Sequence, residues 1–232
     1  MKKTGHHFQS RTLAFTLIEL IVVVAIIAIL AAMIIPIVGS VNARKQISLA
    51  QTQLKGIETA IDGYKSQLRY YPPDNPNNPA INQLYFELMG TTNNGIGRTP
   101  DLWVTLDNSA QIGLSTTPNI NAVFGVAGIA NSSTRSHSDD TGAAAQSFLN
   151  NLTPNQVGLY DLNNPNIKLL ACSIAWPPDR TPIVAANPSL NPWRYNSTHP
   201  TNNTASYDLW VDLIIKGKTN RVSNWSTQPI KL

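Results

Sequence analysis

Hydrophobic and polar positions divide the N-terminal part of the chain into two stretches. Residues 20–38 are nineteen uncharged, almost wholly aliphatic positions, enough for a helix to cross a hydrocarbon layer of about 30 Å. Pro72 and Pro73 cannot continue a helix, so we expect the helix to end near Arg69. Between these limits, apolar positions alternate at spacings of three and four, which predicts one apolar helix face: Ile47, Ala50, Leu54, Ile57, Ile61, Tyr64 and Leu68.

This apolar face, here called the seam, has two interpretations. A coiled coil would explain it, but the seam stops where a different kind of sequence begins, which favours packing beneath a globular domain. Beyond residue 72, short apolar runs alternate with turn residues, and residues 128–146 are small and polar, as in an exposed loop. The pattern predicts an α+β fold, a long helix packed on a small antiparallel sheet. The expected short elements are a helix at 83–89 and strands at 102–106, 156–162, 167–174, 182–185, 193–195 and 207–215.

Composition and charge narrow the class of protein. Charged residues make up 13% of the chain, and the polarity comes instead from Asn, Ser, Thr and 16 prolines, as in loop-rich extracytoplasmic domains. Of the 17 basic residues, Lys2, Lys3 and Arg11 precede residue 15, so the rest of the chain is nearly neutral and no nucleic-acid partner is expected. The single cysteine, Cys172, cannot form an internal disulfide and lies in an apolar run, so we expect a buried thiol.

The residues around position 14 point to processing. Residues 1–14 are basic and end in the small residue Ala14, in front of the apolar run rather than behind it. A cut after Ala14 would leave the apolar segment on the mature protein, unlike an ordinary secretory signal. Glu19 lies inside the predicted membrane segment, where an unpaired carboxylate is costly, and the new amine of Phe15 could pair with it. The alternative is an ordinary signal anchor that tolerates one acid near the interface.

The stretch AFTLIEL at 14–20 resembles the cleavage and methylation motif of type IV prepilins and type II secretion pseudopilins. The resemblance implies that a prepilin peptidase cuts between Ala14 and Phe15 and methylates the new amine, and that Phe15 and Glu19 guide assembly. It also implies a helix kink at Pro36. The chain departs from the family in having Ala14 where glycine is usual; alanine is a tolerated small residue, so cleavage is still expected, and its rate stays open.

Scattered C-terminal residues resemble the major, G-type pseudopilin of type II secretion. They are Tyr64-Lys65, Tyr71-Pro72, NPWRY at 191–195, YDLW at 207–210 and Asn224-Trp225. Residues 85–190 exceed the usual length of that family and form a loop-rich insertion. The resulting division is a cleaved leader at 1–14, a transmembrane and assembly half of the helix at 15–41, an amphipathic half at 42–71 and a periplasmic domain at 72–232 with that insertion.

That family commonly binds calcium after the strand that carries YDL. The corresponding stretch at 214–225 has no carboxylate and three cations, whereas calcium takes six to eight oxygen ligands, usually including carboxylates. We therefore expect no metal or other cofactor. Lys216, Lys218 or Arg221 could hold the stretch instead by pairing with Asp208 or Asp212.

The resemblance implies a filament subunit rather than an enzyme. It would be a single-pass protein of the bacterial inner membrane with its domain in the periplasm. Its implied partners are further copies of itself in a helical homopolymer, the prepilin peptidase, minor pseudopilins, the inner-membrane assembly platform and membrane lipid. The alternatives are a type IV pilin for adhesion, motility or DNA uptake, disfavoured by the missing cysteine pair, and a membrane-tethered polymer-binding domain.

Several residues invite other interpretations that the pattern does not favour. His137, Asp139 and Asp140 lie in the polar loop without a nucleophile motif, so no catalytic residue is expected. His6 and His7 fit a solvated basic leader better than a metal pair. The tryptophans could line a glycan-binding face, but most alternate with apolar residues and are expected in the core: Trp103, Trp176, Trp193, Trp210 and Trp225.

Overall fold

The computed structural model describes residues 16–93, 101–134, 144–149 and 152–232, with only the backbone described at 33–40. The chain divides into two compact units, Met1–Arg44 and Lys45–Leu232. One helix, α1 (Leu17–Leu68), runs through the boundary between them. Each unit is described by itself below.

The end of α1 follows from its local sequence. The helix stops at Leu68, as Pro72 and Pro73 predict, and Arg69 takes a left-handed conformation with φ of 73°. The amide of Arg69 still donates to the carbonyl of Lys65 at 2.8 Å, which satisfies one of the last free carbonyls of the helix. The chain then turns away from the helix axis.

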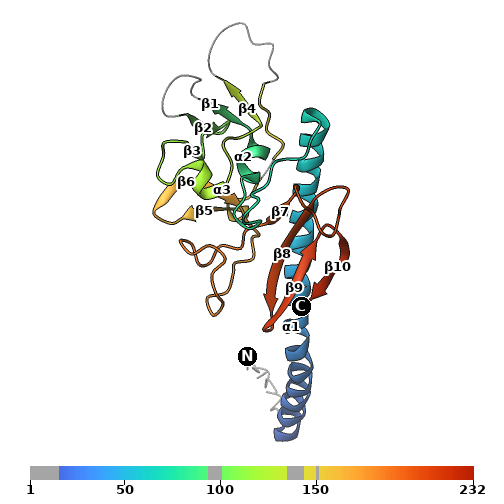
Figure 1. The fold of residues 1–232 in the computed structure, drawn as a ribbon. Helices are drawn as coiled ribbons and strands as arrows, with labels where there is room; N and C mark the ends of the chain where they lie inside the picture. Colours follow the sequence, from blue (N-terminus) through green and yellow to red (C-terminus); the bar gives the residue numbers. More distant parts are fainter. Residues whose placement is uncertain (1–15, 94–100, 135–143, 150–151) are drawn as a thin grey trace, which may run out of the picture. The chain divides into compact units, whose positions relative to one another are not determined.

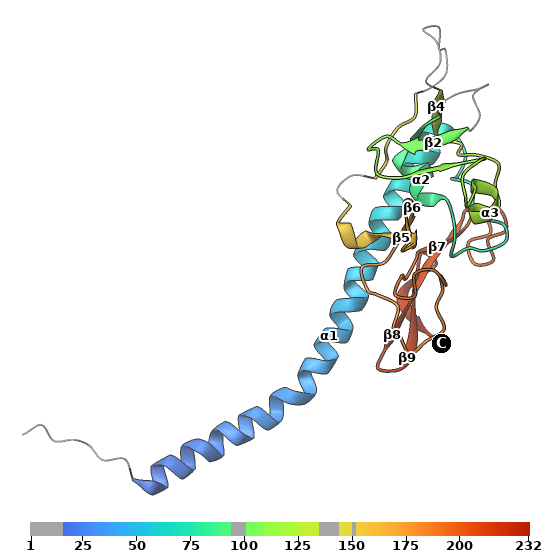
Figure 2. The same ribbon diagram turned by 90° about the vertical axis from the view of Figure 1, so that its left-hand side faces the viewer.

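The predicted seam is the core of the second unit. Ala50, Leu54, Ile57, Ile61 and Tyr64 are at most 3% exposed, and Ile47 and Leu68 pack against the same cluster at its two ends. Packing beneath a domain, rather than a coiled coil, therefore explains the seam. Figures 1 and 2 show the four-stranded sheet of β7–β10 alongside this half of α1.

Besides the second half of α1, the second unit contains three sheets and two short helices. The C-terminal sheet has the order β10-β9-β8-β7 and is antiparallel throughout, while the sheet of order β3-β2-β1-β4 pairs β1 with β4 in parallel. The third is a hairpin of β5 and β6, preceded by the 3-10 turn Pro154–Gln156. The bounds are α2 Leu84–Met89, β1 Thr91–Asn93, β2 Leu102–Thr105, β3 Gln111–Gly113, α3 Ile120–Phe124, β4 Ser132–Thr134, β5 Val157–Asp161, β6 Asn164–Leu170, β7 Arg194–Asn196, β8 Asp208–Ile215, β9 Lys218–Ser223 and β10 Ser226–Lys231.

The α+β class was predicted, and five of the six predicted strands correspond to β2, β5, β6, β7 and β8. The strand expected at 182–185 is wrong, because this segment is turns and bends, with Val184 alone fully buried there. The small single sheet is also wrong, since the described part of residues 85–190 forms one sheet and a hairpin of its own.

The exposed loop expected at 128–146 is wrong for residues 129–134, which include β4, whereas the described residues Ala144 and Gln146 are exposed and lie outside regular structure. Ile129 and Asn131 are buried, and the backbone amides of Ala130 and Asn131 donate to the carboxylate of Glu87 at 2.8 and 2.9 Å. The Tyr64 hydroxyl of α1 donates to the same carboxylate at 2.9 Å. Glu87 thus joins α1, α2 and the start of β4, which fixes the insertion on the long helix.

Candidate functional site

The described N-terminus of α1 is a capping box built from Thr16 and Glu19. The amide and hydroxyl of Thr16 donate to Oε2 of Glu19 at 2.9 and 2.7 Å, and the Glu19 amide donates to the Thr16 hydroxyl at 3.3 Å. This reciprocal pair satisfies two backbone amides that a helix start otherwise leaves free. Glu19 therefore has a partner within its own chain, which the sequence analysis missed although Thr-x-x-Glu is a recognisable signal.

The first unit presents an apolar helix surface. Every large aliphatic side chain between Leu17 and Leu30 is exposed, and Val23, the least exposed of them, still shows 46% of its surface. Contiguous apolar surface of this extent marks a contact with another apolar body. Among the described residues, no helix combines the length and hydropathy that a membrane span needs. The predicted span and its single-pass topology stay predictions.

The processing residues lie at the limit of the described chain. Ala14 and Phe15 lie outside the described residues, so the predicted cut stays a prediction. The α1 backbone continues through Pro36, whose side chain is not described, and the predicted kink is likewise untested. Of the predicted assembly residues, the structure thus describes Glu19, exposed at the first turn of α1.

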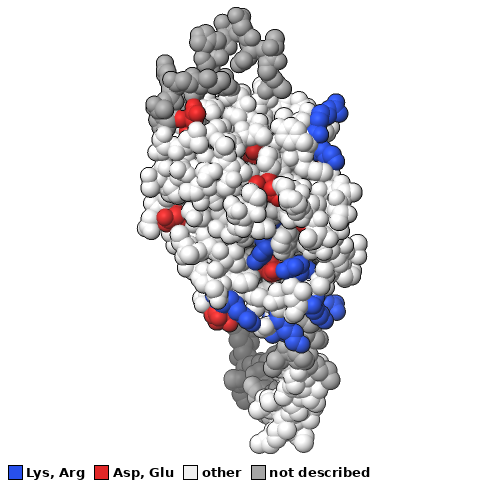
Figure 3. Space-filling view, in the orientation of Figure 1, with Lys and Arg blue, Asp and Glu red and all other residues white. Residues whose placement is uncertain are grey.

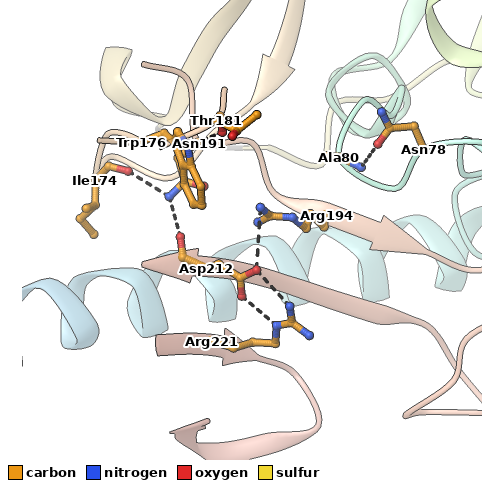
Figure 4. Close-up of polar contacts among 9 residues, drawn as sticks. All are labelled: Asn78, Ala80, Ile174, Trp176, Thr181, Asn191, Arg194, Asp212 and Arg221. Atoms are coloured by element: carbon orange, nitrogen blue, oxygen red, sulfur yellow. Dashed lines mark hydrogen bonds and ion pairs between the residues drawn. The ribbon is translucent and has the colours of Figure 1, made fainter. Parts of the chain in front are cut away.

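Three strands of the C-terminal sheet hold a charged cluster in the second unit (Figure 4). Arg221 on β9 binds Asp212 on β8 through both carboxylate oxygens, with Nε to Oδ1 at 2.8 Å and Nη2 to Oδ2 at 3.0 Å. Arg194 on β7 approaches Oδ2 of the same carboxylate at 3.8 Å. Asp212 and Arg221 are direct cross-strand partners. The pairing of a cation from this stretch with Asp212 is therefore confirmed for Arg221.

The electrostatics of the cluster follow from its partial burial. Burial lowers the pKa of Arg194, and the charge of Arg221 adds to this effect while Asp212 opposes it. The hydrogen bonds to Asp212 raise the pKa of Arg221 above its ordinary value. The ring of Trp210 lies 5.6 Å from the Arg221 guanidinium carbon, and that of Trp176 lies 6.0 Å from the Arg194 one. Both oxygens of Asp212 thus already have cationic partners.

The stretch at 214–225, which corresponds to the calcium loop, consists of the end of β8, a tight turn, β9 and the turn into β10. β8 pairs with β9 up to Ile215 and Lys218, so only Lys216 and Gly217 join them, both in left-handed conformations. Asp208, the other predicted anchor, instead accepts the amides of Thr201, Asn202 and Asn203. Burial alone would raise the pKa of Asp208, but these donors together lower it. Among the described residues, no three His, Cys, Asp or Glu side chains gather as metal ligands would.

The cysteine and the tryptophans considered in the sequence differ in how deeply they are buried. Cys172 is a free thiol, 4% exposed, and burial raises its pKa to about 11, as expected for a structural residue. Trp103 and Trp193 are buried in the core, as predicted, whereas Trp176, Trp210 and Trp225 are half-buried around the charged cluster. His6, His7, His137, Asp139 and Asp140 lie outside the described residues.

Comparison with known proteins finds a match for the N-terminal part of the chain alone. Residues 10–35 match the family model described as the prokaryotic N-terminal methylation motif. No curated protein and no solved structure matches the chain significantly. The matched residues include the Ala14–Phe15 junction, Glu19 and the exposed aliphatic surface. The chain therefore has a type IV prepilin-like N-terminus, and a motif of this kind indicates processing by a prepilin peptidase, self-assembly and a structural role.

Proposed function

We propose that this protein is the structural subunit of a type II secretion pseudopilus-like filament. It is held in the inner membrane after cleavage before Phe15, with the Lys45–Leu232 unit in the periplasm, and polymerises through α1 to support protein export. The observation that carries this proposal is the methylation motif at 10–35 together with the apolar helix surface at 17–30, which the described residues leave exposed. Minor pseudopilins and an inner-membrane assembly platform are the expected partners.

The second unit supports a filament for secretion over a surface pilus. Many surface pilins close a C-terminal loop with a disulfide, whereas the single cysteine here is buried and free. Deleting the gene should reduce the proteins released into the medium while surface filaments, twitching and DNA uptake stay unchanged. Loss of adhesion, motility or DNA uptake with normal secretion would identify a type IV pilin instead. A membrane-tethered polymer-binding domain would leave all of these unaffected.

The assembly role of Glu19 can be separated from its role in the capping box. Glutamine at position 19 can still accept the Thr16 amide but carries no charge to pair with the amine of Phe15. If charge pairing drives assembly, Glu19→Gln and Glu19→Ala should both reduce filaments on the order of tenfold or more, whereas Thr16→Ala should retain most of them.

Filaments counted by electron microscopy and the processed N-terminus determined by mass spectrometry are the two measurements. All three variants should begin at N-methyl-Phe15, because the cut site is unchanged. Normal filaments from Glu19→Gln together with few from Thr16→Ala would show that Glu19 serves only to start the helix. An intact Met1 on the mature wild-type chain would contradict the prepilin interpretation itself.

A further inference from the structure

One end of the second unit carries a cluster of exposed cations that the proposed function does not use. Figure 3 draws one face of the molecule and shows Lys and Arg side chains (blue) gathered toward the lower end of the second unit. We call this cluster the basic patch; its members are Lys45, Arg180, Lys216, Lys218 and Lys231, all exposed.

Strand register brings four of these cations together. Lys216 lies in the β8–β9 turn and Lys218 begins β9. Lys231 lies at the same end, since it pairs with Asn220, two residues beyond Lys218. Arg180 joins them because its Nη2 donates to the carbonyl of Gly217 at 3.0 Å.

The helix brings the fifth cation to the same end. The opposite end of the β9–β10 ribbon touches α1, where Nε2 of Gln51 donates to the carbonyl of Thr227 at 3.2 Å. From Thr227 the strand reaches Lys231 in about 13 Å, and from Gln51 the helix reaches Lys45 in about 9 Å. Both views show the helix and the strands running to one end of this unit (Figures 1 and 2). The basic patch therefore lies at the end of the second unit where that unit starts, at Lys45.

The charges of the patch are poorly balanced by the described residues around it. Asp179 is the acidic neighbour of Arg180, and Asp212 is already bound by Arg221 and Arg194. Among the described residues at this end, five cations thus outnumber the one acidic side chain that forms no salt bridge, on a chain whose basic and acidic residues otherwise nearly cancel. An excess of one sign gathered at one end indicates an anionic partner.

The position of the patch along the chain identifies that partner. Lys45 follows Val38, the last residue of the apolar run, by seven residues, which span at most about 25 Å even when fully extended. If the run is embedded in a bilayer, the patch is tethered within reach of the headgroups, and anionic lipids attract basic segments just outside a membrane helix. We propose that the basic patch binds the phosphate headgroups of anionic phospholipids and holds the second unit against the membrane before assembly. This inference rests on the proposed membrane-inserted subunit.

The test uses the mature chain in nanodiscs of phosphatidylcholine, with or without phosphatidylglycerol, and measures amide hydrogen exchange in the β8–β9 turn. We expect the exposed turn amides to exchange roughly tenfold more slowly when phosphatidylglycerol is present. High salt should abolish the difference, because it screens exposed charges over a few ångströms. Exchange in the buried β8 strand serves as the internal control, since its amides are protected by the sheet in either lipid.

Two charge variants make the test specific. The triple variant Lys216→Gln, Lys218→Gln, Lys231→Gln should lose the slowing by phosphatidylglycerol. The matched variant Lys55→Gln, Lys65→Gln, Arg69→Gln removes the same charge from exposed positions farther along α1 and directly after its end, and should keep the slowing. Equal exchange in both lipids by an inserted wild-type chain, or equal loss in both variants, would overturn the inference. Failure to insert into either nanodisc would count against the proposed membrane-anchored subunit instead.

Discussion

The two halves of α1 carry apolar side chains of similar chemistry, but those of one half are buried and those of the other half are exposed. Between Lys45 and Leu68 the apolar seam is covered by the chain's own sheets, and its central residues are at most 3% exposed. Between Leu17 and Leu30 the large aliphatic side chains are exposed, and the described residues provide no cover. One helix therefore combines a surface that folds the domain with a surface that needs something outside the chain.

The polar contacts of the two halves differ in the same way. The seam carries one buried polar contact, Tyr64 to Glu87, which ties it to the insertion. In the first turn of the first half, the exposed carboxylate of Glu19 accepts hydrogen bonds from Thr16, its one hydrogen-bond partner among the described residues. Substitutions in the two halves should accordingly affect different properties, folding in one and assembly in the other.

The largest effect on stability is expected when an isoleucine is replaced by alanine in the second half of α1, and the same replacement in the first half serves as its comparison. Ile61→Ala removes a fully buried side chain and should lower the free energy of unfolding of the second unit by about 2–5 kcal/mol. Ile26→Ala removes a side chain that is 52% exposed and should change the same quantity by less than about 0.5 kcal/mol. Denaturant unfolding of the full chain in detergent, followed by tryptophan fluorescence, measures both. Equal destabilisation by the two variants would end the distinction between the halves.

A smaller effect is expected from pH, through the buried carboxylate on the seam. Burial raises the pKa of Glu87 to about 7, although the donors from Ala130, Asn131 and Tyr64 favour its ionised form. The folded state therefore holds a proton that the unfolded state releases near pH 4.5, and stability falls as pH rises from about 4.5 to about 7. The shift corresponds to roughly 3 kcal/mol.

The matched variant for this pH effect is Glu87→Gln, which removes the titrating group and keeps the shape of the side chain. It loses hydrogen bonds at every pH, so its absolute stability drops, but the slope between about pH 4.5 and 7 should nearly vanish. The full chain in detergent, unfolded by urea at a series of pH values, gives the slopes. A variant with the wild-type slope would place the pH dependence on another group.

Sequence pattern predicted the elements that depend on local periodicity and missed those that depend on contacts distant in sequence. The seam and the end of α1 follow from spacing and two prolines, and both were predicted. β9 was missed because KTNRVS at 218–223 is polar at five of its six positions, and its pairing with β8 is set by the two-residue turn before it. The burial of Asn131 was missed because its partner Glu87 lies 44 residues away.

The residues of the candidate sites show the same difference between local motifs, which the sequence predicts, and contacts between distant segments, which it does not. The Ala14–Phe15 junction and Glu19 form a local motif that the family model also matches. The capping box was available from Thr16 and Glu19, three residues apart, and was overlooked because Glu19 was interpreted as a partner for the new amine of Phe15. The role of Arg194 beside Asp212 could not be read from the chain, since it requires β7 and β8 to be neighbours.

The smallest expected effect is that of added calcium on the stability of the β7–β10 sheet, which packs alongside the second half of α1. Arg221 and Arg194 already occupy both oxygens of Asp212, and the β8–β9 turn has only two residues, so Asp212 offers no free oxygen and the turn offers no loop for calcium. Added calcium should leave the melting temperature of the full chain in detergent unchanged, within the shift caused by magnesium at equal ionic strength. A rise specific to calcium would mean that the sheet over the second half of α1, like the apolar surface of the first half, is completed by something the chain does not carry.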